Sequence, residues 1–265
     1  MIRKRTHHLE RTIWHPQAHS LEEQKLIFAD LKGLEKNPRL DSVTKRILAW
    51  SRRIQREYDR GDHCDADDCP VWEKKVRRKD SPVATESLMK LLKMRRSRRL
   101  FENTPLSQGE RELITEASQW APSSCNRQTV ELIFVEDPRL KNWLSKTIPG
   151  GYQFFHEAPA IVIVLSDSRD YRYPQDRNAG YIDAAASVQN IFLVCETMNL
   201  GVCWGSYTSF GNVLRESEVR EKLKIPDTHI IVASLAIGKS EQFVCEIPRD
   251  EPEKRYGIDS FRANI

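Results

Sequence analysis

The sequence predicts an α+β fold, in which strands and helices alternate without a regular βαβ repeat. Three apolar runs, at residues 129–137, 160–167 and 228–238, are rich in β-branched residues and are typical of strands. The run at 160–167 is apolar without a break, which predicts a strand buried on both faces. Residues 181–201, "YIDAAASVQNIFLVCETMNLG", form a helical stretch that is apolar nearly all round and that we expect to end at Gly201. Such a helix belongs in a core or in a subunit interface.

The first eighty residues predict a charged, helical extension, and residues 81–265 the main domain. Ser20 and Glu23 have the spacing of a capping box, and Asp41 is placed to cap a second helix. Each predicted helix carries one apolar stripe, so we expect both to pack on the main domain or on a partner.

The loop at residues 61–75 contains His63, Cys64 and Cys69 among acidic residues. A metal site there is conceivable, but the two cysteines lack the usual C-x2-C spacing and no second ligand pair follows. The spacing therefore favours an acidic, solvated loop.

The main domain opens with a short predicted helix that carries Leu88, Leu91 and Leu92. A stretch of arginines follows. Ser107 and Glu110 then form another capping-box pattern, which predicts the start of a second helix.

The overall composition argues against several classes of partner. The 265 residues include 42 basic and 38 acidic side chains, a balance too even for a protein that coats nucleic acid. The longest apolar runs fall well short of the roughly 20 residues that span a bilayer. No apolar segment follows the basic N-terminus, so we expect no secretory signal, and the six scattered cysteines fit free thiols in the cytoplasm.

Common catalytic side-chain patterns do not occur in the sequence. His156 and His229 each stand alone near a predicted strand, where a structural histidine is the favoured interpretation. If the protein is an enzyme, the reactive group is expected to be a cofactor.

Three short stretches stand out, and each has two interpretations. "RRSRRLF" (95–101) has four arginines that suit nucleic acid, an anionic surface or a bound phosphate. "WAPSSCNRQ" (120–128) offers hydroxyls, amides and backbone N–H groups, either for a polar heterocycle or as a helix-to-strand connector. "LGVCWGSYTSF" (200–210) contains Gly205, which permits close approach of the backbone to a ligand; the alternative is a turn with a core tryptophan.

In this order and at these spacings, the three stretches resemble the FMN-dependent nitroreductase superfamily. "RRSRRLF" is similar to the family's R-R-S-x-R-x-F opening, "APSSCNRQ" to its A-P-S-S-x-N-x-Q loop, and the helix with the following "GVCWGS" to its G-L-G-x-x-W-x-G turn. The resemblance covers residues from about 88 to the C-terminus. Asn199 stands where the family often has glycine, and the turn after Trp204 is one residue shorter than usual.

The resemblance implies a three-layer α+β sandwich, with a central mixed β-sheet flanked by helices. It also implies a domain-swapped C-terminal arm and a homodimer with two FMN sites at its interface. The implied function is transfer of electrons from NAD(P)H through bound FMN to a small, planar, electron-poor acceptor. Alternatives are a biosynthetic oxidation or a reductive dehalogenation on the same fold and, from another class, a basic adaptor for nucleic acid or an anionic surface.

The resemblance also implies roles for particular residues. Arg95, Ser97 and Arg99 would meet the flavin phosphate, the ribityl chain and the N1/O2 edge. We expect Arg96 and Arg98, at the alternate positions, to face solvent or acidic neighbours and to tolerate removal. The whole implied cofactor-binding set is Arg95, Arg96, Ser97, Arg99, Pro122, Ser123, Ser124, Asn126, Gln128, Gly205, Ser206, Arg249, Lys254 and Arg255.

Within this set, four loop residues would reach the flavin from the other subunit: Pro122, Ser123, Ser124 and Asn126. Gly205 and Ser206 would place a backbone N–H near flavin N5, so no catalytic side chain is implied. One C-terminal base, Arg249, Lys254 or Arg255, would complete the phosphate site. Tyr152, Phe154, Phe155 and the segment 168–181 fall where the family's channel lid varies, so the substrate itself is not predicted.

Overall fold

A computed structural model describes residues 83–152, 154–171, 173–205, 213–249 and 251–252, together with separate positions between residues 26 and 56. The described positions between 26 and 56 are helical. The loop at 61–75 lies outside the described residues, as do Ser206, Lys254 and Arg255.

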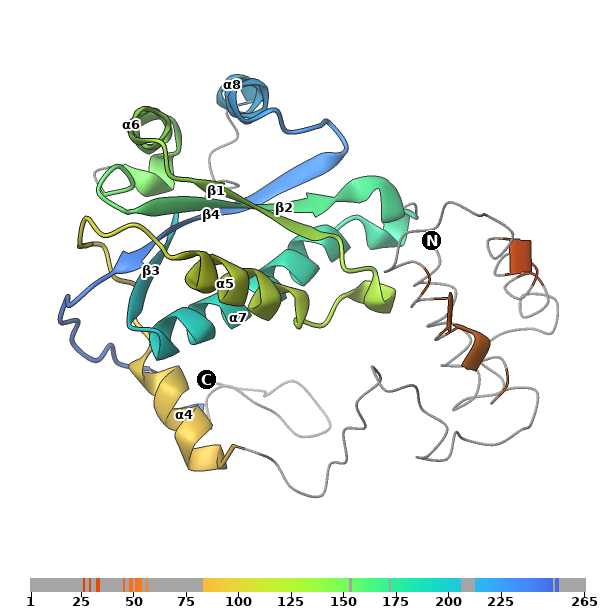
Figure 1. The fold of residues 1–265 in the computed structure, drawn as a ribbon, viewed down its shortest axis with the longest axis horizontal. Helices are drawn as coiled ribbons and strands as arrows, with labels where there is room; N and C mark the ends of the chain where they lie inside the picture. The colour runs from red at the N-terminus through yellow and green to blue at the C-terminus, as the bar shows by residue number, and fades with distance from the viewer. Residues whose placement is uncertain are drawn as a thin grey trace, which may run out of the picture.

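The centre of the protein is a four-stranded sheet with the order β1-β2-β4-β3 (Figure 1). Its strands are β1 (Val130–Val135), β2 (Ala160–Asp167), β3 (Leu200–Gly205) and β4 (His229–Lys239). The three strands predicted from the apolar runs are therefore confirmed. All three strand pairings are antiparallel, whereas the resemblance implied a mixed sheet. Among the described residues, the parallel component is an isolated bridge between Ser97 and Val202.

Within residues 83–252, the longer helices with described structure are α4 (Thr85–Met94), α5 (Gln108–Gln119), α6 (Pro138–Thr147), α7 (Ala179–Thr197) and α8 (Val213–Leu223). The capping box that opens α5 is confirmed: the Ser107 N–H donates to Glu110 Oε2 at 2.6 Å, and the Glu110 N–H donates to Ser107 Oγ at 3.2 Å. In the part of the chain with described structure, no helix combines the length and apolarity needed to cross a membrane.

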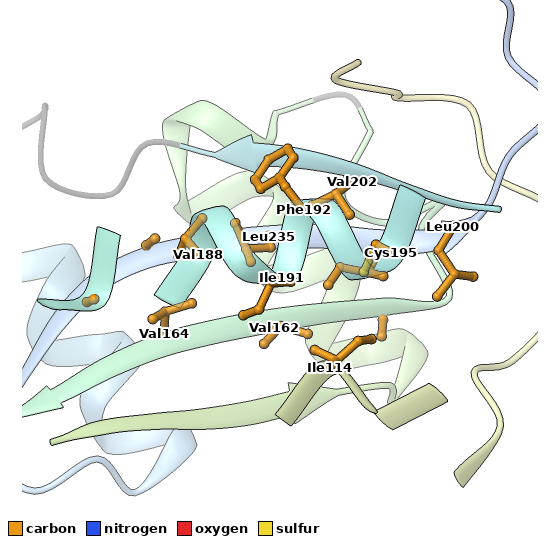
Figure 2. Close-up of a cluster of buried hydrophobic side chains, with 14 of the residues drawn as sticks. Ile114, Val162, Val164, Val188, Ile191, Phe192, Cys195, Leu200, Val202 and Leu235 are labelled. Atoms are coloured by element: carbon orange, nitrogen blue, oxygen red, sulfur yellow. The ribbon is translucent and has the colours of Figure 1, made fainter. Parts of the chain in front are cut away.

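The sheet separates two apolar cores, which makes three layers (Figure 1). Helices α5 and α7 cover one face, and α6 and α8 cover the other. The first core joins α5 and α7 to the sheet through residues that include Ile114, Val162, Val188, Ile191 and Leu235 (Figure 2). Alternate residues of β2 point to opposite cores, so every residue from Ala160 to Ser166 is buried. This explains the unbroken apolar run and confirms the predicted sandwich.

The segment after α7 differs from the sequence-based expectation. The helix ends at Thr197, and Asn199 has the left-handed φ of 57° that commonly terminates helices. Asparagine tolerates this conformation better than most residues, so it can end the helix at a position where the family often has glycine. Gly201 lies instead inside β3, which was not predicted as a strand.

Candidate functional site

The main chain of the arginine stretch is fixed along the edge of β3 and the end of β4. The Arg98 N–H donates to the Val202 carbonyl at 3.1 Å, and the Glu102 N–H donates to the Lys239 carbonyl at 2.9 Å. The side-chain oxygen of Gln242 accepts from the N–H groups of Arg99 and Leu100, at 2.7 and 3.1 Å. The backbone that carries the arginines is therefore held from both sides.

The close approach of this stretch depends on a glycine. A Cβ on Gly201 would lie 2.7 Å from the Ser240 Cβ and 2.9 Å from the Arg98 Cβ, closer than carbon atoms can pack. Glycine at this position in β3 therefore lets the stretch lie against the sheet.

The four arginine side chains separate into two pairs. Arg98 makes two hydrogen bonds with Glu196 near the end of α7, at 2.6 and 3.0 Å. Arg96 donates to the backbone carbonyls of Lys93, Arg95 and Cys245. Arg98 thus faces an acidic neighbour, as predicted, and Arg96 is bound to its surrounding backbone.

Arg95 and Arg99 are placed differently. The Arg95 guanidinium lies 5.3 Å from the ring centre of Phe192, and that of Arg99 lies 5.8 Å from the ring centre of Phe154. In the ranges with described structure, neither guanidinium forms a salt bridge with a carboxylate. Arg95 and Arg99 therefore lack the carboxylate partner that Arg98 has in Glu196.

Positive charge is crowded around Arg95. Burial and the charge of Arg96 hold the pKa of Arg95 below its ordinary value; Glu196 opposes this shift, and Arg249 and Arg98 add to it. Arg249, one of the three predicted C-terminal bases, is thus near enough to act electrostatically on Arg95. An anion bound here would relieve the repulsion among these cations.

The loop after α5 is held in an unusual conformation. It contains the short helical turn Ser124–Asn126, and Cys125, Asn126 and Gln128 have φ values of 53°, 51° and 53°. The Gln128 N–H donates to Ser123 Oγ at 3.0 Å, which closes the loop on itself. Left-handed backbone is unfavourable for such residues, so the surroundings must hold this shape.

A buried carboxylate that we did not predict anchors this loop. The Ser124 N–H lies 3.0 Å from both oxygens of Asp183, and Ser124 Oγ lies 3.0 Å from Asp183 Oδ1. The Tyr171 hydroxyl donates to Asp183 Oδ2 at 2.7 Å. Asp183, on the first turns of α7, is 3% exposed.

Arg127, in the same loop, is a second residue whose role in the site we did not predict. Its side chain is buried, pairs with Asp176 at 2.8 Å and lies 5.0 Å from the ring centre of Tyr171. In the sequence, Asp183 is distinguished only as a charged residue in an apolar helix, and Arg127 only as a charged residue in a polar, neutral loop.

Gly205 ends β3 against a buried aromatic ring. Its carbonyl accepts from Ser234 Oγ at 2.9 Å. A Cβ on Gly205 would lie 2.4 Å from Phe155 Cζ, so the glycine is required by close packing. Phe155 is fully buried and packs in the second core. Trp204 is 40% exposed, which corrects the interpretation of this stretch as a turn with a core tryptophan.

The arginine stretch (residues 95–101) and the loop after α5 (residues 120–128, here the serine loop) lie at opposite ends of α7. The arginine stretch is attached at Glu196, and the serine loop is attached at Asp183. Thirteen residues of helix separate these two anchors, which corresponds to about 20 Å. The structure therefore does not bring the two groups together within one chain.

Arg98→Ala is expected to lower the free energy of unfolding by about 1–3 kcal/mol, between the values for exposed and for buried ion pairs. Arg98 and Glu196 have side chains that are 19% and 8% exposed, so removal of the cation leaves a poorly solvated carboxylate. Urea unfolding measures this loss of stability, with Arg111→Ala as the control, because the Arg111–Glu136 pair is 34% and 40% exposed. Equal losses in the two variants would contradict the prediction.

The Tyr171 hydroxyl is expected to make stability depend on pH in the alkaline range. Burial, together with the hydrogen bond to Asp183, raises the pKa of Tyr171 from 10.0 to about 12. Because the folded protein favours the neutral phenol, this stabilisation is present below pH 10 and is lost as the pH rises towards 12. Unfolding free energies between pH 9 and 12 should fall more steeply for the unaltered protein than for Tyr171→Phe. If the unfolding free energies of the two proteins fell in parallel with pH, the predicted role of Tyr171 would be contradicted.

His229, one of the two histidines near a predicted strand, has a structural role. His229 is buried, and its ring contacts Thr228 Oγ1 at 3.1 Å and Glu131 Oε2 at 3.3 Å, so it is a satisfied structural histidine, as predicted. Among the described residues, Cys195, Cys203 and Cys245 are free thiols.

The three-layer sandwich, with a cation-rich stretch and a serine loop outside its sheet, defines an α+β protein of the nitroreductase type. Solved structures with this fold include NfrA1 of B. megaterium, with a TM-score of 0.61 and 22% identity over 67% of this chain and 76% of that one. The chain belongs to the nitroreductase family, because the family's sequence model matches residues 92–150 and 144–239, together more than half of its length.

Individual relatives are 25–28% identical to this chain over the regions that match. An Archaeoglobus fulgidus protein, named as a candidate NADH dehydrogenase/NAD(P)H nitroreductase, is 28% identical over 68% of this chain and 95% of its own length. An NADPH-dependent oxidoreductase of Staphylococcus epidermidis is 28% identical over 58% of this chain but only 65% of its own length. A solved FMN-dependent nitroreductase from Clostridium difficile is 25% identical, with a TM-score of 0.57 over 65% of this chain and 99% of that one.

Proposed function

We propose that this protein is an FMN-dependent oxidoreductase that passes electrons from NAD(P)H to a small, planar, electron-poor acceptor. The observation that carries the proposal is the pair Arg95 and Arg99, two guanidiniums without a carboxylate partner among the described residues, on a backbone that is hydrogen-bonded from both sides. The names of the Clostridium and Staphylococcus relatives supply the cofactor and the electron donor.

The residues present fit an FMN molecule. A guanidinium binds a phosphate through two parallel hydrogen bonds, so Arg95, crowded by other cations, suits the phosphate, with Arg249 beside it. Arg99 suits the N1/O2 edge of the ring system, where a cation stabilises negative charge. When bound, FMN supplies the redox chemistry, taking up a hydride from the nicotinamide and passing electrons to the acceptor.

The protein's own contribution is position, charge and exclusion of water. Gly205, held through its carbonyl and packed on Phe155, would fix the end of β3 against which the ring system is proposed to lie. No side chain is required to accept a proton at this point, in line with the absence of a common catalytic pattern in the sequence.

We further propose a homodimer in which the serine loop of one subunit meets the arginine stretch of the other, with the C-terminal arm exchanged. The two groups are attached to opposite ends of α7 within one chain, so a partner subunit is needed to unite them. The α5–α7 face also carries exposed apolar side chains, Trp120 at 77% and Ile182 at 65%. Exposed aromatic and apolar side chains are common at protein interfaces.

The test of the proposal starts with the purified full chain. It should be yellow, with a flavin absorbance near about 450 nm, and stopped-flow mixing with NADH or NADPH should bleach that band. Light scattering should give twice the chain mass of 30.8 kDa. A colourless protein that does not bind added FMN would overturn the proposed function. A 30.8 kDa species that retains FMN would overturn the dimer alone.

The alternatives are less well supported. Two of the four arginines are occupied by Glu196 and by backbone carbonyls, which leaves little of the continuous cationic surface that an adaptor for nucleic acid needs. Biosynthetic oxidation and reductive dehalogenation would use the same flavin site, and the names of the relatives favour reduction with NAD(P)H. A cytoplasmic location stays a prediction from the sequence.

We also propose that residues 1–80 form an extension that is separate from the flavin site. All three motifs of the resemblance lie after Leu88, so a chain that begins at Ser81 is expected to form the dimer and bind FMN, with lower solubility and an altered choice of acceptor. Flavin titration and an acceptor screen compare the two chains. A dimer of the shortened chain that cannot hold FMN would show that the extension builds part of the site.

A further inference from the structure

We propose that Asp183 is a positioning residue for FMN binding: from inside the protein, it holds the serine loop in the shape that receives the flavin. The inference rests on the proposed function and adds a residue that does not itself touch the cofactor. It is carried by the hydrogen bonds that join Asp183 to Ser124 and to Tyr171.

Asp183 has the properties of a buried anchor. It is 3% exposed, and its carboxylate accepts from the Ser124 N–H, the Ser124 hydroxyl and the Tyr171 hydroxyl. Among the described residues, no cation forms a salt bridge with it. A carboxylate buried in this way is costly unless its hydrogen bonds are formed, so it strongly favours the one loop conformation that forms them.

The loop needs such an anchor. Cys125, Asn126 and Gln128 adopt left-handed backbone, which all residues other than glycine disfavour. The internal bonds, from the Gln128 N–H to Ser123 Oγ and from the Gln128 amide to Asn126 Oδ1, keep the loop compact but do not attach it to the fold. The bonds between Ser124 and Asp183 attach it to α7 at a fixed position.

Asp183 is itself connected to the sheet by further hydrogen bonds. The Tyr171 hydroxyl, which donates to Asp183, lies 2.6 Å from Thr129 Oγ1, and Thr129 Oγ1 lies 3.1 Å from Ser166 Oγ at the end of β2. Tyr171 also belongs to the segment that the resemblance identifies as a variable lid. Asp183 therefore links the serine loop, the lid segment and the sheet in one hydrogen-bonded chain.

The test measures FMN affinity and folding stability separately in matched variants. Titration of the flavin-free full chain with FMN, followed by quenching of flavin fluorescence, gives the dissociation constant; urea unfolding gives the stability. Asp183→Ala is expected to weaken FMN binding roughly tenfold or more, by analogy with the loss of residues that orient the ligands of a metal.

Asp183→Asn is the conservative rescue. Its amide oxygen still accepts from the Ser124 N–H and hydroxyl, and its amide N–H₂ can donate to the Tyr171 hydroxyl, which then donates to Thr129. We therefore expect FMN affinity close to that of the unaltered protein.

Ser187→Ala is the matched control. Ser187 lies one turn further along α7, is buried, and donates to the Ser118 carbonyl at 3.0 Å instead of to the loop. Its loss should lower stability without changing FMN affinity. Equal FMN affinity in Asp183→Ala and Ser187→Ala would overturn the inference.

Two further outcomes are informative. If Asp183→Ala does not fold, Tyr171→Phe is the deciding variant, because it removes only the hydrogen bond from the Tyr171 hydroxyl to Asp183. FMN binding that is weakened severalfold in this variant supports the inference. Unchanged FMN binding overturns it. If the unaltered protein itself does not bind FMN, the proposed function fails, and the variants are not needed to show it.

Discussion

Arg95→Ala is expected to weaken FMN binding by roughly thirty- to a thousandfold, which corresponds to about 2–4 kcal/mol and is estimated from the truncation of one partner of a buried charge pair. The variant would leave a doubly charged phosphate without the guanidinium that is proposed to bind it through two hydrogen bonds. It would also relieve the crowding of cations around this position, so the stability of the flavin-free protein should not fall. Flavin fluorescence titrations at one fixed salt concentration measure the affinity.

The other three arginines are the controls for this experiment. Arg99→Ala should retain FMN better than Arg95→Ala but slow its reduction by NAD(P)H, because the charge that develops at the N1/O2 edge loses its partner. Arg96→Ala and Arg98→Ala should change FMN affinity little, since their side chains are bound to backbone carbonyls and to Glu196. Equal effects of all four substitutions on flavin retention would contradict the proposed roles and favour the adaptor interpretation.

Phe155→Ala is expected to lower the free energy of unfolding by about 3–5 kcal/mol, as for other large side chains removed from a core. The ring is fully buried and fills the space left by two glycines: a Cβ on Gly151 would lie 2.2 Å from it, and a Cβ on Gly205 would lie 2.4 Å from it. The loss should also weaken FMN binding, because the end of β3 that is proposed to face the flavin would lose its support. Urea unfolding and flavin titration measure the two effects.

A double-mutant cycle tests whether Phe155 and Gly205 act together. Gly205→Ala in the unaltered background should destabilise by about 1–3 kcal/mol, as for other overpacked cores. In the Phe155→Ala background it should cost clearly less, because the nearest remaining atom, the backbone carbon of Gly150, is 3.2 Å away. Additive effects would show that the ring is not what requires glycine at this position.

The parts of the fold that the sequence predicted are those with a strong local signal. The β-branched runs gave β1, β2 and β4, and the capping box gave the start of α5. Helix α6 also had a local signal that was overlooked: Asp137 caps it through the Leu140 N–H, and Pro138 opens it.

Strand β3 could not be recognised in the same way. It has two glycines in six residues, and it is a strand because it pairs with β4 along its whole length. The end of α7 was misplaced for a related reason: Asn199, with its positive φ, terminates the helix two residues before the glycine that the pattern suggested.

The candidate site was predicted in part. The arginine stretch and the serine loop were found by resemblance, and the pairing of Arg98 with an acid followed from its alternate position. Asp183 could not be found, because one acidic residue at the start of an apolar helix has no sequence signature of its role. That role depends on a loop sixty residues earlier in the chain, whose left-handed backbone only three-dimensional contacts can hold.

The burial of β2 on both faces has a consequence for how the strands align. In a sheet with one wet face, a shift of one residue exposes apolar side chains and is thereby excluded. In β2 such a shift would only exchange the residues of the two cores, so the apolar side chains alone select weakly between alignments. For β2 the selection falls to a buried hydroxyl, because Ser166 needs Thr129. A hydroxyl left without a partner would cost about 1–3 kcal/mol, so one serine decides which of two nearly equivalent alignments the folding chain keeps.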